Sequence, residues 1–142
     1  MGLLIQDALR RPELFQWHGR IAPTILDRWL VAHKLRVPDD LYAFWRETGG
    51  GELFETETIL APFGEPSLGD DIDGANRYHR DHGLPEDLLL FHIGVCYSAI
   101  SLSDSAYVSS DSPSFSIRRR HASLDGWYFG EIRKEYGDRY GL

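Results

Sequence analysis

The sequence predicts a single α+β domain in which a largely antiparallel sheet is flanked by helices. The chain has 142 residues, enough for one hydrophobic core. Helical periodicity occupies the two ends and one central segment, whereas residues 88–117 have the composition of strands joined by short turns. Strands that follow one another through short turns pair antiparallel, so we expect a bent, mainly antiparallel sheet and not a doubly wound one.

The first part of the chain divides into a lead-in and a first helix. Residues 1–22 are interpreted as an N-terminal lead-in, with an amphipathic turn before Pro12, and residues 23–142 as the domain. Thr24 is expected to cap the first helix through its hydroxyl. The apolar face of that helix consists of Ile25, Leu26, Trp29 and Leu30.

Residues 37–51 have the features of one complete helix. Pro38 suits the first helical position, and Asp39 and Asp40 in the first turn complement the helix dipole. The glycine run at 49–51 supplies the left-handed residue that ends a helix, so we expect positive φ at Gly49 or Gly50. The buried stripe follows helical spacing and consists of Leu41, Phe44, Trp45 and Thr48.

The middle of the chain is expected to form a strand, a loop and a helix. Residues 57–63 have strand composition and residues 64–69 have that of a loop. Residues 71–82 are interpreted as a helix that Asp70 or Asp71 caps and Gly83 ends.

The last third is expected to be strands and a terminal helix. Residues 88–93 are continuously apolar, which predicts a strand buried on both faces, and residues 100–103 alternate, which predicts a half-buried strand. Residues 106–108 and 115–117 flank a predicted turn at 109–113. Ser123 is expected to cap the final helix, whose inner face carries Leu124, Trp127, Tyr128 and Ile132.

The charge is concentrated in the middle of the chain. The net charge is −7, and residues 39–87 hold thirteen acidic residues against three basic ones, Arg46, Arg77 and Arg80. Such a region repels nucleic acid and favours a basic partner; the alternative is a solvated surface that keeps the protein dispersed. Cys96 is the one cysteine, and neither a signal peptide nor a membrane span is apparent, so we expect a cytoplasmic protein.

The best candidates for a metal site are Asp70, Asp71, Asp73, His79 and His82. Their spacing matches no known ligand pattern, and six residues place Asp73 and His79 on different sides of a helix. Helix capping by the acids and dipole compensation by the histidines explain them better. We therefore expect no metal.

Other chemical motifs give no catalytic residue either. Cys96, in a predicted strand, lacks an activating neighbour in sequence and is interpreted as a small core residue. The glycines at 49–51 are not followed by the residues of a phosphate loop. The arginine run at 118–120 favours a charged edge strand over a nucleic-acid site. We expect a protein that is not an enzyme and has no cofactor.

The helix and glycine run resemble the signature of the SUKH superfamily. Pro38 and Phe44 match its proline and following aromatic, Gly49–Gly51 stand for its Asn-Gly-Gly, and Val37 replaces the usual leucine. Glycine and asparagine both tolerate the left-handed conformation, so that change is mild. The remaining features that fit the family layout are residues 88–91, Ser103, Asp104 and Trp127.

The resemblance implies a non-enzymatic binding protein. Bacterial members of the superfamily are generally regarded as immunity proteins that neutralise toxins, often nucleases or deaminases, and such toxins tend to be basic. Two alternatives stay open: a general protein-interaction or regulatory module, and a metal-dependent hydrolase. The candidate partner-binding residues form an acidic stretch without a basic residue: Glu52, Glu55, Glu57, Glu65, Asp70, Asp71 and Asp73.

Overall fold

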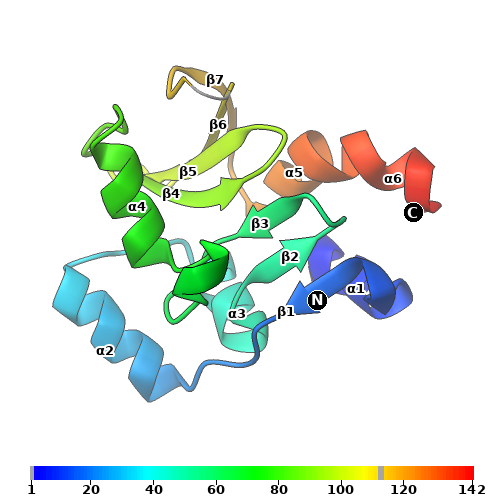
Figure 1. Cartoon of the computed structure of the whole chain (residues 1–142), viewed down its shortest axis with the longest axis horizontal. Coiled ribbons are helices and arrows are strands. Elements are labelled where there is room, and N and C mark those ends of the chain that lie inside the picture. Colours follow the sequence, from blue (N-terminus) through cyan, green and yellow to red (C-terminus); the bar gives the residue numbers. More distant parts are fainter. Residues whose placement is uncertain (1, 112–113) are drawn as a thin grey trace.

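The strands follow one another across one sheet in the order of the sequence, and each is antiparallel to its neighbour (Figure 1). A computed structural model describes residues 2–111 and 114–142. This is the single α+β domain that the sequence predicts. The strands are β1 (Phe15–Trp17), β2 (Gly51–Leu53), β3 (Glu57–Ile59), β4 (Leu88–Ile93), β5 (Tyr97–Ser101), β6 (Tyr107–Ser110) and β7 (Ile117–His121).

Helices lie on both sides of the sheet, with α2 and α4 together on one side of the molecule and α1 near the C-terminal helix (Figure 1). The C-terminal helical segment is continuous, and its middle is a π-helix. The α-helices are α1 (Leu3–Arg10), α2 (Pro23–His33), α3 (Asp39–Thr48), α4 (Ile72–Arg80), α5 (Leu124–Trp127) and α6 (Lys134–Tyr140), the π-helix is η3 (Tyr128–Arg133), and the 3₁₀ turns are η1 (Pro12–Leu14) and η2 (Pro66–Leu68).

The lead-in of the sequence analysis belongs to this core. Leu4 of α1 is 1% exposed, and Phe15 of β1 pairs with Leu53 of β2. Buried Asp7 accepts hydrogen bonds from Tyr128 and Arg133 of the C-terminal helix, both at 2.7 Å. Residues 2–22 therefore contribute a helix and an edge strand, neither of which the sequence analysis assigned.

The second predicted helix is confirmed, together with its end. Gly49 and Gly50 have φ of +69° and +73°. Pro38 is the N-cap and not the first helical residue, so the helix begins one position later than predicted. Trp45, fully buried, donates its indole N–H to the Leu60 carbonyl at 3.0 Å and so fixes α3 against the chain after β3.

Helix α4 supplies hydrogen bonds to β4 beyond the point where β4 pairs with β3. The strands β3 and β4 pair only between Thr58–Ile59 and His92–Ile93. Beyond that point the Asn76 side chain of α4 accepts from the Leu90 N–H at 2.8 Å and donates to the Leu90 carbonyl at 2.9 Å. These bonds satisfy backbone groups of a buried strand that would otherwise lack partners.

Two of the predictions for the first half of the chain are wrong. Thr24 does not cap α2, because the helix begins at Pro23, whose missing N–H suits the first helical position, and Ala22 is the N-cap without a side-chain bond. The predicted strand at 57–63 ends at Ile59, since Leu60 instead donates its N–H to Phe91 and the chain then turns.

The strands of the second half are more buried than predicted. β4 is buried as expected, but the predicted half-buried strand at 100–103 is wrong: β5 spans Tyr97–Ser101, and Ile100 and Ser101, on opposite faces, are both buried. Ser98 lies inside because its hydroxyl accepts the indole N–H of Trp127 at 2.8 Å. Cys96 is buried as predicted, although it lies in the hairpin between β4 and β5 and not in a strand.

The predicted turn at 109–113 begins later, because β6 continues to Ser110; residues 112 and 113 lie outside the described residues. The predicted strand at 115–117 is β7, which starts at Ile117 and contains the arginine run. It is the charged edge strand that the sequence predicts. Ser123 caps the final helix by accepting from the Gly126 N–H at 3.0 Å, and the four predicted inner residues are buried.

The glycine at the end of α3 gives a direct test of this packing. A Cβ on Gly49 would lie 2.1 Å from the Gly19 carbonyl oxygen, whereas a Cβ on Gly69, at a similar φ of +75°, would meet nothing within 4 Å. We expect Gly49→Ala to lower the free energy of unfolding by well over the roughly 1–2 kcal/mol of the left-handed backbone penalty, and Gly69→Ala by that penalty alone. Chemical denaturation measures both. Equal losses would show that the close approach at Gly49 is unimportant.

Candidate functional site

The seven carboxylates proposed for partner binding do not form one surface. Glu57 and Asp70 are each 1% exposed and point into the protein. Glu52 is half-buried in β2, and Glu55 is exposed in the turn between β2 and β3. The remaining three, Glu65, Asp71 and Asp73, lie around η2 and the start of α4.

Those three carboxylates are held by neutral donors or by histidine. Glu65 accepts the Ser67 hydroxyl at 2.9 Å, which lowers the pKa of Glu65. Asp71 caps α4 by accepting from the Gly74 N–H at 3.1 Å, as the sequence predicts. Asp73 accepts the indole N–H of Trp29 at 3.2 Å and pairs with His33 at 2.9 Å, so it joins α4 to α2.

The five residues of the metal hypothesis point to different places. Asp70 pairs with His18 at 2.5 Å, a residue of the lead-in that the sequence analysis did not connect with it. His79 packs against Tyr97 and Phe115, and burial lowers the pKa of His79. His82 stacks on Tyr78. Among residues 2–111 and 114–142, no group of three or more candidate ligands converges on a cation.

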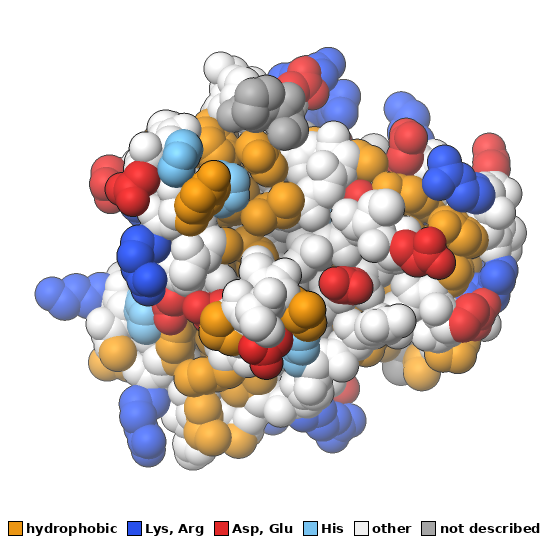
Figure 2. Space-filling model, in the orientation of Figure 1, with side chains coloured by type: hydrophobic (Ala, Val, Ile, Leu, Met, Phe, Trp, Pro, Cys, Tyr) orange, Lys and Arg blue, Asp and Glu red, His pale blue; other side chains and the backbone are white. Residues whose placement is uncertain are grey.

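Apolar side chains lie exposed between the acidic residues. A groove of about 310 Å³ separates α2 from Phe63, and another of about 320 Å³ separates η2 from α4. Hydrophobic and acidic side chains lie over α2, η2 and α4 in the space-filling view, with basic and histidine side chains among them (Figure 2). We refer to the following residues as the acidic–apolar face: Ile25, Phe63, Glu65, Leu68, Asp71, Asp73 and Tyr78.

Phe63 has the most unusual backbone on this face. Its φ is +65°, in the left-handed region, and its side chain is 57% exposed. A bulky residue in this conformation costs about 1–3 kcal/mol, and an exposed ring recovers little of that by burial. No local sequence signal marks the conformation, because glycine or asparagine would be expected at such a position.

A buried acid–histidine–serine chain connects β3, β4 and β5. Glu57 accepts the Nε2–H of His92 at 2.8 Å, and the other ring nitrogen of His92 lies 2.9 Å from the Ser98 hydroxyl. The residue types are those of a nucleophilic triad, but His92 and Ser98 are fully buried, and Ser98 already accepts from Trp127. No substrate reaches the hydroxyl, so the chain holds strands together.

The hydrogen bonds of this chain are mutually consistent. The Glu57 carboxylate only accepts, so Nε2 of His92 donates to it, and the Ser98 hydroxyl is the partner of Nδ1. Burial opposes ionisation of Glu57, but hydrogen bonds from His92, Val95 and Tyr136 outweigh it and hold the pKa of Glu57 below its ordinary value. One sequence signal could have revealed this chain: a histidine inside the apolar run 88–93 needs a buried partner.

A second buried carboxylate, Glu131, joins β7 to the C-terminal helix. Glu131 accepts two hydrogen bonds from Arg119, at 2.8 and 2.9 Å, and pairs with His121 at 2.6 Å. Burial opposes ionisation, but the bonds from Arg119 and His121 prevail and lower the pKa of Glu131 to about 2. The arginine run is thus neutralised at least in part within the protein.

Comparison with models of known protein families and with curated proteins finds no match for this chain. Within the described residues, no helix has the length and apolar character needed to cross a membrane. The function is therefore inferred from the surface and the sequence resemblance.

The Glu131 cluster predicts a pH dependence of stability. Folding lowers this pKa from 4.5 to about 2, so the ionised cluster stabilises the protein fully above pH 4.5, and that gain is lost as the pH falls toward 2. We expect Glu131→Gln to cost about 1–3 kcal/mol at pH 7 and progressively less below pH 4.5. Denaturation across pH tests this, with exposed Glu135→Gln as control. A cost that stays constant down to pH 2 would contradict it.

Proposed function

We propose that this protein is a SUKH-type immunity protein that binds and neutralises a basic toxin domain through its acidic–apolar face. The observation that carries the proposal is Phe63, an exposed aromatic ring on a left-handed backbone that lines the groove beside α2. Strained residues persist where a function retains them. A large aromatic side chain at the centre of an interface is a typical source of binding energy.

The composition of the face supports a basic partner. Glu65 and Asp71 accept hydrogen bonds from Ser67 and Gly74, respectively, neither of which neutralises charge, and Arg28 is the basic residue that lines the groove beside Phe63. Toxin domains that act on nucleic acids carry basic surfaces to engage phosphates. An acidic face accelerates their association and disfavours neutral or acidic competitors.

Two other functions have less support. A regulatory module without a toxin could use the same face, and the reading frame next to this gene would distinguish it, since a toxin gene there favours immunity. A metal-dependent hydrolase would need Asp71, Asp73, His79 and His82 close together, whereas Asp71 caps α4 and Asp73 pairs with His33.

Phe63→Asn should raise stability and weaken binding at the same time. Asparagine tolerates the left-handed region better than phenylalanine, so we expect a gain of about 0.5–1 kcal/mol in unfolding free energy. Loss of the ring should weaken the affinity for the toxin domain about tenfold or more. Thermal unfolding and calorimetric binding to the toxin of the neighbouring reading frame measure the two effects.

A matched pair of leucines controls this experiment. Leu68, on the face, is 63% exposed, and Leu9, on α1, is 67% exposed. Leu68→Ala should weaken protection of cells that express the toxin, and Leu9→Ala should not. If both leucine variants and Phe63→Asn protect like the parent, the toxin docks elsewhere or the protein has another role.

Charge on the face should act mainly on the rate of association. We expect Glu65→Lys to slow association with a basic toxin several-fold at low salt and to change dissociation little, because exposed charges steer encounter. The control is Glu135→Lys, which reverses an exposed charge on α6. Stopped-flow kinetics across ionic strength provide the measurement. An association rate that changes neither with salt nor with Glu65→Lys would rule out electrostatic steering by this face.

A further inference from the structure

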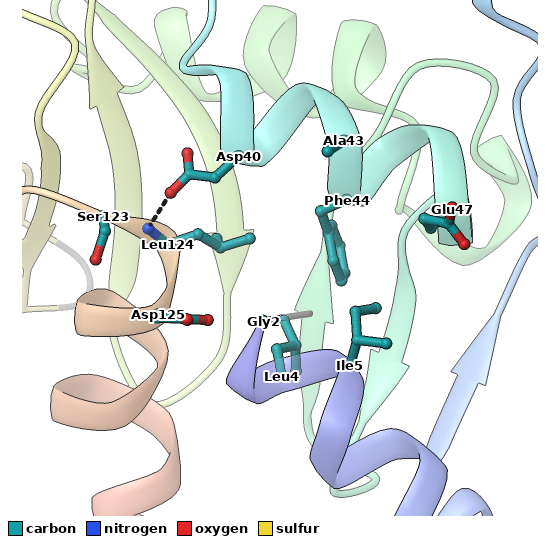
Figure 3. A pocket seen from close by; sticks show the side chains of 10 residues that line it. All are labelled: Gly2, Leu4, Ile5, Asp40, Ala43, Phe44, Glu47, Ser123, Leu124 and Asp125. Atoms are coloured by element: carbon teal, nitrogen blue, oxygen red, sulfur yellow. Dashed lines mark hydrogen bonds between the residues drawn. The ribbon is translucent and has the colours of Figure 1, made fainter.

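A pocket of about 410 Å³ lies between α1, α3 and α5, apart from the acidic–apolar face (Figure 3). Its volume is within the range of small-molecule sites. Leu4 and Ile5 of α1 face Phe44 of α3 across it, and Leu124 of α5 closes one side (Figure 3). The body of any ligand bound there would contact apolar carbon.

The charged residues at the pocket are all acidic. Asp40, Glu47 and Asp125 line it, and no Lys, Arg or His is among its lining residues. The three are exposed, so they face solvent at the pocket mouth. A ligand that enters the pocket therefore meets negative charge.

Two of these carboxylates are fixed in place by neutral groups. Asp40 accepts from the Leu124 N–H at 2.7 Å and from the Tyr107 hydroxyl, and Asp125 accepts from the Leu3 N–H at 2.9 Å. Neutral donors orient a carboxylate without removing its charge. Glu47 has an arginine partner, Arg20 at 3.3 Å, but both side chains are largely exposed and such pairs are weak.

Helix dipoles reduce this negative charge but do not cancel it. The N-terminal ends of α1, α3 and α5 are near the pocket, and the N-terminal end of a helix carries roughly half a positive charge at most. Three such ends offset about half of three carboxylates. The remaining negative potential lies over an apolar cavity, which is the complement of a cation with an apolar body.

We propose that this pocket binds a small organic amine: an ammonium group held by Asp125, with an aliphatic or aromatic body against Leu4, Phe44 and Leu124. The proposal is independent of toxin binding, because it uses none of the residues of the acidic–apolar face.

Three probes of nearly equal shape test it: phenylbutylamine, phenylbutanol and phenylbutanoate. We expect the amine to shift the backbone amide signals of Ala43 and Leu124 saturably in an NMR titration of the full chain. The alcohol should bind at least threefold more weakly, and the carboxylate should not bind. Equal binding of the three probes, or none at millimolar concentration, would overturn the proposal.

Variants separate charge from shape. Asp125→Asn, whose amide oxygen can still accept from the Leu3 N–H, should weaken the amine at least threefold and leave the alcohol unchanged, whereas Glu135→Gln, away from the pocket, should change neither. Ala43→Trp should block both probes by filling the cavity, with the remaining NMR spectrum showing that the fold is retained. If Ala43→Trp unfolds the protein, Asp125→Asn still decides, because an amine affinity equal to that of the parent contradicts a role for charge.

Discussion

The close approach of three backbone segments at Gly49–Gly51 is the constraint on which the rest of the structure depends. Cβ atoms on Gly49, Gly50 and Gly51 would lie 2.1, 2.7 and 2.0 Å from the carbonyl oxygens of Gly19, Ile59 and Gln16. Only glycine permits those distances together with positive φ. The run ends α3 and at once starts β2 between β1 and β3. The glycine run therefore fixes β2 between β1 and β3, and β3 leads directly into the acidic–apolar face.

Elements with strong local signals could be predicted from the sequence. The helix at 39–48, the buried strand at 88–93 and the Ser123 cap each carry their own periodicity or end signals. β1 and β2 could not be predicted, because a strand of three residues has too few positions for alternation to show. The burial of β5 depends on Trp127, which is distant in sequence, and so could not be predicted from residues 97–103.

The candidate site was predictable only in part, because a count of charges does not reveal burial. Glu57 and Asp70 belong to the same acidic stretch as Glu65, yet each is buried against a histidine more than thirty residues away in sequence. The exposed ring of Phe63 has no sequence signal, since its importance lies in a backbone angle. The acidic stretch in the sequence indicates where the acidic–apolar face lies, and the structure shows which of its residues are exposed there.

Hydrogen exchange of the protein alone and in complex with the basic toxin of the neighbouring reading frame tests the central claim most directly. Docking on the acidic–apolar face predicts slower exchange in residues 61–78 and in α2, with little change in α6 and β7. Protection confined to α6, β7 or the α1–α3–α5 pocket, with unchanged exchange in residues 61–78, would contradict the account.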